Sequence, residues 1–123
     1  MISIGTANEK GTIVITCVFT DEDGDAVVPN TISWTLTDGA GDVVNSREQV
    51  SVAIPASTTN IVMSGDDLEL EATDTSQYID RYFLIEATYN STYGTDLPLR
   101  DSAYFKIENL KLKIENEFFD KVI

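Results

Sequence analysis

Histidine is absent from this chain, and cysteine occurs only once. Histidine is the side chain that most often moves protons in catalysis, and with cysteine it forms common nucleophile–base pairs. Without it the usual acid–base and nucleophilic constellations cannot be assembled. The chain also has no glycine-rich loop of the kind that cradles phosphates. The sequence therefore predicts a protein that is not an enzyme and that holds no cofactor.

The single cysteine, Cys17, cannot form a disulfide within the chain. It falls on the apolar face of a predicted strand, where a small buried residue is commoner than a nucleophile. The first residues, Met1-Ile2-Ser3-Ile4, have no basic group and no extended apolar core, unlike a secretory signal. Apolar runs elsewhere are too short to span a membrane. We therefore expect a chain made in the cytoplasm, with no membrane partner.

Basic residues are scarce: 8 Lys and Arg stand against 21 Asp and Glu among 123 residues, for a net charge of −13. Binding of nucleic acid needs a basic face, so a nucleic-acid partner is not expected. The charge is also uneven. Residues 1–105 hold 17 acidic and 4 basic side chains, whereas the last 18 residues hold four of each and are neutral. This asymmetry indicates that the C-terminal segment works in a different environment from the body.

What the chain does contain is period-two alternation of apolar and polar side chains over short segments between turns. Ile13, Ile15, Cys17 and Phe19 share one face of such a segment, and the pattern resumes around Trp34, the only tryptophan. Repeated Val, Ile and Thr favour strands over helices. The predicted strands are Ile2–Ile4, Thr12–Thr20, Thr31–Thr37, Val43–Asn45, Gln49–Ile54, Asn60–Ser64, Arg81–Asn90 and Ser102–Ile107.

Several of these segments carry more detailed predictions. In Gln49–Ile54 every second residue, Ile54 included, is expected to point inward. Arg81–Asn90 is apolar on both faces, which indicates a central strand covered on both sides. A loop is expected over Ser91–Asp101, and Asp66 is expected to cap a helical turn.

Turn signals at short intervals, and a tryptophan on the second of two paired strands, are typical of immunoglobulin-like sandwiches. A chain of 123 residues is long enough for one domain with one core. The predicted fold is therefore an all-β, immunoglobulin-like or fibronectin-III-like β-sandwich of about seven strands. Residues 1–109 are assigned to the sandwich and residues 110–123 to a short C-terminal arm.

Asp21, Asp23 and Asp25 resemble the opening of a calcium-binding loop. That motif has glycine at its sixth position and a bidentate glutamate at its twelfth, where this chain has Ala26 and Ile32. The flanking segments are predicted strands, whereas the motif lies between helices. We expect a solvated turn without a metal, and these three aspartates are the one candidate for a metal site.

A second acidic group surrounds the predicted helical turn: Asp66, Asp67, Glu69 and Glu71. Two carboxylates across a cleft can act as an acid–base pair. Nothing in the sequence places these four across a cleft, so we interpret them as surface acids of an acidic protein.

The C-terminal segment carries two competing patterns. Residues 110–114 alternate as an edge strand does, whereas apolar residues also recur every four residues, as on a helix. We favour an extended arm to about Ile114 and then a helical turn. Its large apolar side chains either fold back on the sandwich or fill a groove on a partner. The candidate partner-binding residues are Leu110, Leu112, Ile114, Phe118, Phe119, Val122 and Ile123.

Six short stretches of the chain carry a resemblance to a known group of proteins. They are Thr6–Thr12, Phe19–Gly24, Ser33–Asp38, Asn45–Glu48, Ile61–Leu68 and Glu86–Ser91. Together they look like small virion proteins of tailed bacteriophages, over most of residues 6–107. The resemblance implies a non-enzymatic, immunoglobulin-like particle component, at the head–tail junction or decorating the capsid. It implies no catalytic residue, and residues 110–123 lie outside it.

Two classes of function follow from these observations. The first is a virion structural protein, made in the host cytoplasm, whose partners are capsid, portal or tail proteins and further copies of itself. The alternative is a bacterial or phage adhesion or binding module on the same sandwich. A secreted module normally has a signal, an anchor or neighbouring domains, none of which this sequence displays, so we favour the virion protein.

Overall fold

The structure, a computed structural model, describes residues 2–71 and 74–111 of the chain. These residues form seven strands and one short 3-10 helix, which confirms the predicted all-β class. In chain order the elements are β1 (Ile2–Asn8), β2 (Thr12–Val18), β3 (Thr31–Thr37), β4 (Val50–Ser51), β5 (Thr58–Ser64), the 3-10 helix η1 (Gly65–Leu68), β6 (Tyr78–Ser91) and β7 (Gly94–Glu108).

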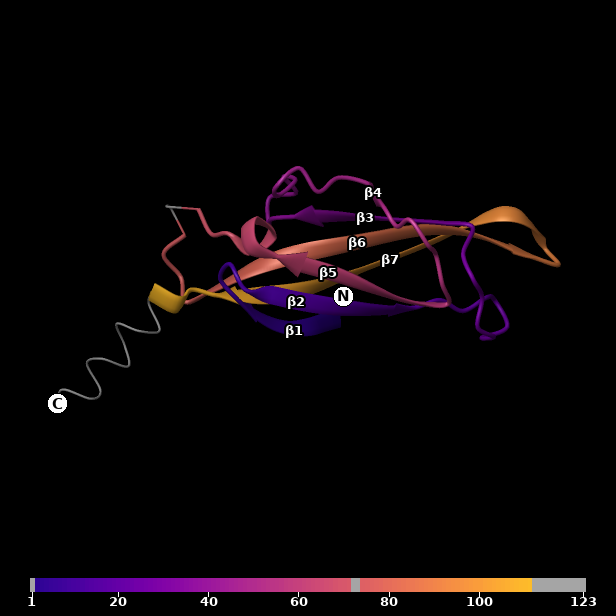
Figure 1. The fold of residues 1–123 in the computed structure, drawn as a ribbon, viewed down its shortest axis with the longest axis horizontal. Coiled ribbons are helices and arrows are strands. Elements are labelled where there is room, and N and C mark those ends of the chain that lie inside the picture. The colour runs from indigo at the N-terminus through magenta and orange to yellow at the C-terminus, as the bar shows by residue number, and fades with distance from the viewer. Residues whose placement is uncertain (1, 72–73, 112–123) are drawn as a thin grey trace.

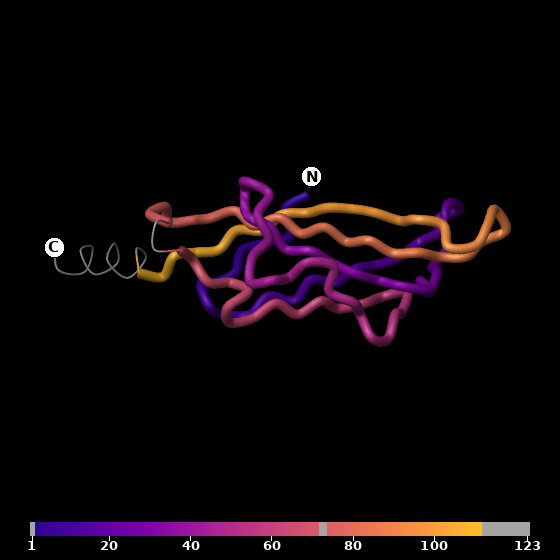
Figure 2. The backbone as a smooth tube through the Cα atoms, turned by 90° about the horizontal axis from the view of Figure 1, so that it is seen from above, coloured from indigo at the N-terminus to yellow at the C-terminus, as the bar shows by residue number. Residues whose placement is uncertain are grey.

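Two sheets of unequal width lie against each other (Figures 1 and 2). The wide sheet has five strands in the order β1-β7-β6-β3-β4, and the narrow sheet pairs β2 with β5. The pairs are antiparallel, except that the first and last strands, β1 and β7, run parallel. This arrangement is consistent with a β-sandwich.

The core between the sheets is built from the alternating residues of the strands. Their other faces carry polar, half-buried or exposed side chains, so the period-two pattern of the sequence decides which side chains face inward. The buried apolar residues are Ala7, Ile15, Phe19, Ile32, Trp34, Leu36, Ile61, Met63, Leu68, Phe83, Ile85, Ala87, Phe105 and Ile107.

Trp34 on β3 is only 6% exposed, which confirms its predicted burial. The centroid of its ring lies 6.2 Å from that of Phe83, with the two planes tilted by 40°. Tilted aromatic pairs at this separation are favourable because the ring edge of one faces the π-surface of the other. The guanidinium carbon of Arg47 lies 6.0 Å from the Trp34 ring centroid, within reach of a cation–π contact.

A long hairpin joins β6 to β7 and corrects the loop that was predicted over Ser91–Asp101. Pairing continues through this region to Ser91 opposite Gly94. The prediction failed because Pro98 lacks an N–H and reads as a strand breaker. Pro98 pairs with Thr88, whose carbonyl accepts from the Asn30 N–H on the other side of β6. Pro98 therefore occupies a position where no hydrogen bond to β6 is made, on a stretch of β7 that has no second neighbour.

The central position predicted for β6 is confirmed, because it lies between β7 and β3. Its predicted cover on both faces is wrong among the described residues, since Tyr82 and Leu84 on the outer face are only half-buried. The ring centroids of Tyr82 and Tyr104 lie 6.3 Å apart across the two strands. Apolar side chains of neighbouring strands thus shield one another on an open face.

β4 is much shorter than the strand predicted over Gln49–Ile54. Only Val50 and Ser51 pair with β3, and Ile54 is 84% exposed where an inward position was expected. β4 is the last strand of the wide sheet and has a partner on one side only. After Ser51 the chain crosses to β5 in the other sheet. The alternation therefore continues in the sequence up to Ile54, but no strand pairing fixes the direction of these side chains.

The segment between β3 and β4 is irregular, so the strand predicted over Val43–Asn45 is wrong. Val43 makes only an isolated bridge to Thr37, and Asn45 and Ser46 have φ angles of 52° and 55°, outside the range of strands. The segment nevertheless stays attached to β3, because the Leu36 N–H donates to the Arg47 carbonyl at 2.9 Å. It thereby carries Asn45 and Arg47 toward the end of β5.

The carboxylate of Asp67 on η1 ties this segment to the narrow sheet. Asp67 is 3% exposed and accepts hydrogen bonds from Arg47 Nε at 2.7 Å, Asn45 Nδ2 at 2.8 Å and the Ser64 N–H at 3.2 Å. The N-cap of η1 is Ser64 and not Asp66 as predicted. Asp67 in the sequence looks like one surface acid among several; its burial depends on two donors about 20 residues away.

Burial raises the pKa of Asp67, but the hydrogen bonds from Arg47, Asn45 and Ser64 lower it by more, so its pKa lies below the ordinary value. A carboxyl group whose pKa is depressed in the folded state stabilises that state above the pKa of the unfolded chain. This stabilisation is lost as the pH falls through the folded-state pKa.

We expect Trp34→Ala to lower the free energy of unfolding by about 3–5 kcal/mol, because it empties a large volume in the core. Tyr93→Ala removes a side chain that is 75% exposed and should change stability by less than about 0.5 kcal/mol. Urea unfolding of both variants measures the difference. In the folded wild type, Trp34 fluorescence should be blue-shifted from that of free indole; emission like that of indole in water would contradict the burial of Trp34.

We expect Asp67→Asn to cost about 2–4 kcal/mol at pH 7, because an NH₂ group then faces the donors that the carboxylate accepted. Asp66→Asn, an exposed neighbour on the same 3-10 helix, is the matched control and should be nearly neutral. The difference between wild type and Asp67→Asn should shrink as the pH falls below about 4, the ordinary range of Asp. A difference in unfolding free energy that stays constant down to pH 2 would count against the network.

Candidate functional site

The structure brings Asp21, Asp23 and Asp25 together in the turn after β2. Oxygens of the three carboxylates lie within 4.8 Å of one another. Asp21 Oδ1 accepts from the N–H groups of Asp23 and Asp25, both at 3.0 Å, and this folds the turn tightly. If each side chain binds through one oxygen, the three supply fewer ligands than the six to eight oxygens that calcium prefers, and one Asp21 oxygen already accepts two N–H groups. The cluster thus reads as an acidic turn stabilised by its own backbone.

This acidic turn lies against the β6–β7 hairpin. The Tyr89 hydroxyl donates to Glu22 Oε2 at 2.8 Å. The bond raises the pKa of Tyr89, while the pKa of Glu22 is lowered by its own backbone N–H and then by Tyr89. A pocket of about 420 Å³ opens here, lined by Glu22, Asp23, Tyr89, Tyr93 and Leu97. The sequence placed part of this hairpin in a loop, so the contact was not foreseen.

An acidic pocket of about 510 Å³ surrounds the end of η1, with Asp66, Glu69 and Glu71 among its lining residues. Asp67 does not join them, because it turns toward Arg47. Arg81 also lines this pocket; its Nη1 donates to the Asp80 carbonyl at 3.0 Å, and its Nη2 lies 3.9 Å from Asp74. Its Nε has no hydrogen-bond partner among the residues that the structure describes, and this atom is buried. The arrangement gives a solvated acidic surface over a structural arginine.

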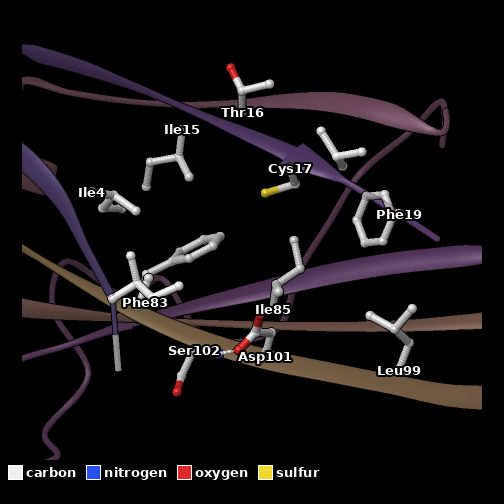
Figure 3. Close-up of a pocket in the computed structure, with 13 residues that line it drawn as sticks. Ile4, Ile15, Thr16, Cys17, Phe19, Phe83, Ile85, Leu99, Asp101 and Ser102 are labelled. Atoms are coloured by element: carbon white, nitrogen blue, oxygen red, sulfur yellow. Dashed lines mark hydrogen bonds between the residues drawn. The ribbon is translucent and has the colours of Figure 1, made fainter. Parts of the chain in front are cut away.

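An apolar pocket of about 220 Å³ opens between the two sheets, beside the start of β1 (Figure 3). Phe83 and Ile85 of the wide sheet and Ile15 of the narrow sheet form its interior, and Leu99 and Ile4 form its sides. We call this site the inter-sheet groove. It is the most apolar of the three pockets described here.

The groove is open because both strands beside it have a free edge. Among the residues that the structure describes, β1 pairs with β7 only from Ala103 onward, so the preceding residues Leu99 and Asp101 have no strand beside them on that edge. Across the groove, β2 pairs with β5 alone among the described strands. The sequence signal was available: Leu97, Leu99 and Asp101 alternate at period two, but Pro98 within them favoured a loop.

Cys17 contributes its sulfur to this groove, where it points toward the interior (Figure 3). The thiol is half-buried, whereas the sequence favoured a buried core position. Burial raises its pKa, and the nearby carboxylate of Asp101 raises it further. A thiol with a raised pKa is a poor nucleophile at neutral pH.

The predicted partner-binding set falls almost entirely outside the described residues. Leu110 is half-buried and, with Lys111, is helical, so the edge strand favoured there is wrong for these two residues. The Asn109 N–H donates to the Gln77 carbonyl at 2.8 Å and fixes the end of β7 to the start of β6. Leu112, Ile114, Phe118, Phe119, Val122 and Ile123 lie outside the described residues.

Comparison with protein-family models, with curated proteins and with solved structures finds no match to this chain. None of the helical residues that the structure describes belongs to a helix long and apolar enough to cross a membrane.

We expect millimolar calcium to leave the melting temperature unchanged, because a ligand stabilises the folded state only in so far as it binds that state. Thermal unfolding with calcium and with EDTA measures this. A rise of several degrees that disappears in Asp23→Ala would instead establish a site in the acidic turn.

Proposed function

We propose that this protein is a non-enzymatic structural component of a tailed-bacteriophage virion that assembles through protein–protein contacts. The observation that carries the proposal is the inter-sheet groove, an apolar opening between two free strand edges. Apolar openings of this kind on a folded domain usually serve recognition. The sequence resemblance over residues 6–107 supports a place at the head–tail junction or on the capsid.

The proposal includes an immunoglobulin-like fold. The order of the strands supports it: β3, β6 and β7 are neighbours in one sheet, β2 and β5 form the other, and Trp34 on β3 packs inward. Immunoglobulin-like domains arrange their third, sixth and seventh strands and their buried tryptophan in this way. A sandwich with a single buried core is suited to a particle component that has to present a surface.

The charge distribution supports assembly through the C-terminal segment. Residues 1–105 carry the whole charge of −13, so folded bodies repel one another. The segment from residue 110 onward is neutral and contains Phe118, Phe119, Val122 and Ile123. Each large apolar side chain that becomes fully buried contributes about 1.5–3 kcal/mol, enough in combination to oppose the repulsion.

A second candidate is an adhesion or binding module, favoured by one feature of the molecule. The β6–β7 hairpin extends beyond the body of the sandwich, with Tyr93 exposed at its turn (Figure 1). Tyrosine at such a tip is a common recognition residue. A module of this kind acts without belonging to a particle, so the composition of purified particles separates the two candidates.

We expect full-length protein, but not a chain truncated after Asn109, to be found by mass spectrometry in particles purified from the organism that carries the gene. The truncated chain should fold with a melting temperature close to that of the full chain, because the core residues lie before its end. A full-length variant with Phe118→Ser and Phe119→Ser controls for length. Absence of the full-length protein from particles would refute the virion role, and unfolding of the truncated chain would place the segment in the core.

A further inference from the structure

The inter-sheet groove has an uncovered backbone edge, but that edge is poorly suited to accept another strand. Pro98 interrupts the donors of β7, and the exposed charges of Asp96, Arg100 and Asp101 surround it. Proline and charges on an edge are features that prevent pairing with further strands. A partner therefore fills the groove with side chains and not by extending the sheet.

The size and lining of the groove suit an aromatic ring. A dry cavity of about 150 Å³ lined by aliphatic and aromatic side chains accepts benzene. The groove offers about 220 Å³, with Ile15, Phe83, Ile85 and Leu99 in its lining. A phenyl ring fits this space and needs no hydrogen-bond partner there.

The phenylalanines of the chain point to the occupant. There are five, and Phe19, Phe83 and Phe105 are buried in the sandwich. The remaining two are Phe118 and Phe119, in a segment without net charge. A neutral segment approaches an acidic body without the repulsion that a second body brings.

We propose that the inter-sheet groove of one copy receives Phe118 or Phe119 of a second copy of this chain. The inference rests on the proposed assembly through the C-terminal segment and names the surface that receives it. The described chain leaves β7 at the end of the sandwich away from the hairpin (Figure 1). β1 covers the β7 edge from Ala103 to Glu108, between that exit and Leu99. A segment that returned to its own groove would have to reverse direction and run back along the whole of β1, whereas that of a neighbour enters from outside.

Cys17 makes the proposal directly testable, because it lines the groove and is the only cysteine of the chain. Two full-length proteins are mixed: one with Cys17→Ser and either Phe118→Cys or Phe119→Cys, and the wild type, isotopically labelled. Each variant retains the other phenyl ring. Diamide oxidises the mixture by taking up two electrons and two protons per disulfide, and mass spectrometry identifies the linked peptides.

We expect a disulfide between Cys17 of the labelled chain and the introduced thiol of the unlabelled chain. Two controls should give at least about tenfold less of this product: Asn116→Cys as the donor, and Val62→Cys with Cys17→Ser as the receiver. Val62 lies on the outer face of β5 and is exposed, so it reports random encounters. Equal yields from the groove and from Val62→Cys would overturn the proposal.

Chains that carry both Cys17 and Phe118→Cys distinguish a neighbour from self-docking. Disulfides that form only within one chain would overturn the assignment to a second copy. If the Phe118→Ser, Phe119→Ser variant loses association while no link to Cys17 forms, the segment docks elsewhere; the groove proposal then fails and the proposed function stands. Absence from particles, by contrast, bears on the proposed function alone.

A measurement without thiols guards against misfolded variants. Leu99→Asp places a charge at the side of the groove and should weaken self-association about tenfold or more by analytical ultracentrifugation. Val62→Asp introduces the same charge on the other sheet and should change the dissociation constant of self-association by no more than about twofold. Association of the wild type should strengthen with added salt, because screening reduces the repulsion between bodies. Association unaffected by Leu99→Asp in a chain that still folds would refute the groove as the receiving surface.

Discussion

The unequal width of the two sheets is the constraint on which the rest of this structure depends. A two-stranded sheet faces a five-stranded one, so β2 and β5 cannot cover the whole inner face of the wide sheet. The middle strands, β3 and β6, place Trp34 and Phe83 in the core between the sheets. The edge of β7 before Ala103 lies beyond the cover of β1, and the inter-sheet groove opens there.

The part of the wide sheet that the narrow sheet leaves uncovered differs between the two sides of the sandwich. On the side of β3 and β4, a loop and the helix η1 close the gap, and the Asp67 carboxylate joins them through Arg47 and Asn45. The same Arg47 lies over the ring of Trp34, so the polar link rests on the aromatic core. On the side of β1 and β7 there is no equivalent link among the described residues, and apolar side chains border the opening. One side is therefore stabilised by the buried carboxylate of Asp67, whose pKa is lowered. The other side contains the half-buried thiol of Cys17, whose pKa is raised.

The body and the C-terminal segment differ in charge: the body is acidic, and the C-terminal segment is neutral and contains large apolar side chains. The acidic body keeps copies apart in solution, which favours solubility. In the proposed assembly, a neutral segment with large apolar side chains would supply attraction that depends on contact and not on long-range charge. Such a combination allows association where many weak contacts act together, as they do in a particle.

The sequence by itself determined most of the strands and the inward faces of β2 and β3. Period-two alternation is a local property, so the inward face of β2 and the burial of Trp34 follow from it directly. The acidic turn at Asp21 was likewise readable, because its hydrogen bonds stay within five residues.

The tertiary structure alone decided the features that depend on residues distant in the chain. Pro98 is compatible with β7 only because Thr88 turns its carbonyl toward Asn30. Asp67 is buried because the side chains of Asn45 and Arg47 donate hydrogen bonds to it. The alternating segment beyond Ser51, up to Ile54, has no strand to pair with. Among the described residues, the groove lies where the pairing of β1 with β7 begins, at Ala103. Each outcome depends on what lies opposite a residue, and a local pattern carries no information about that.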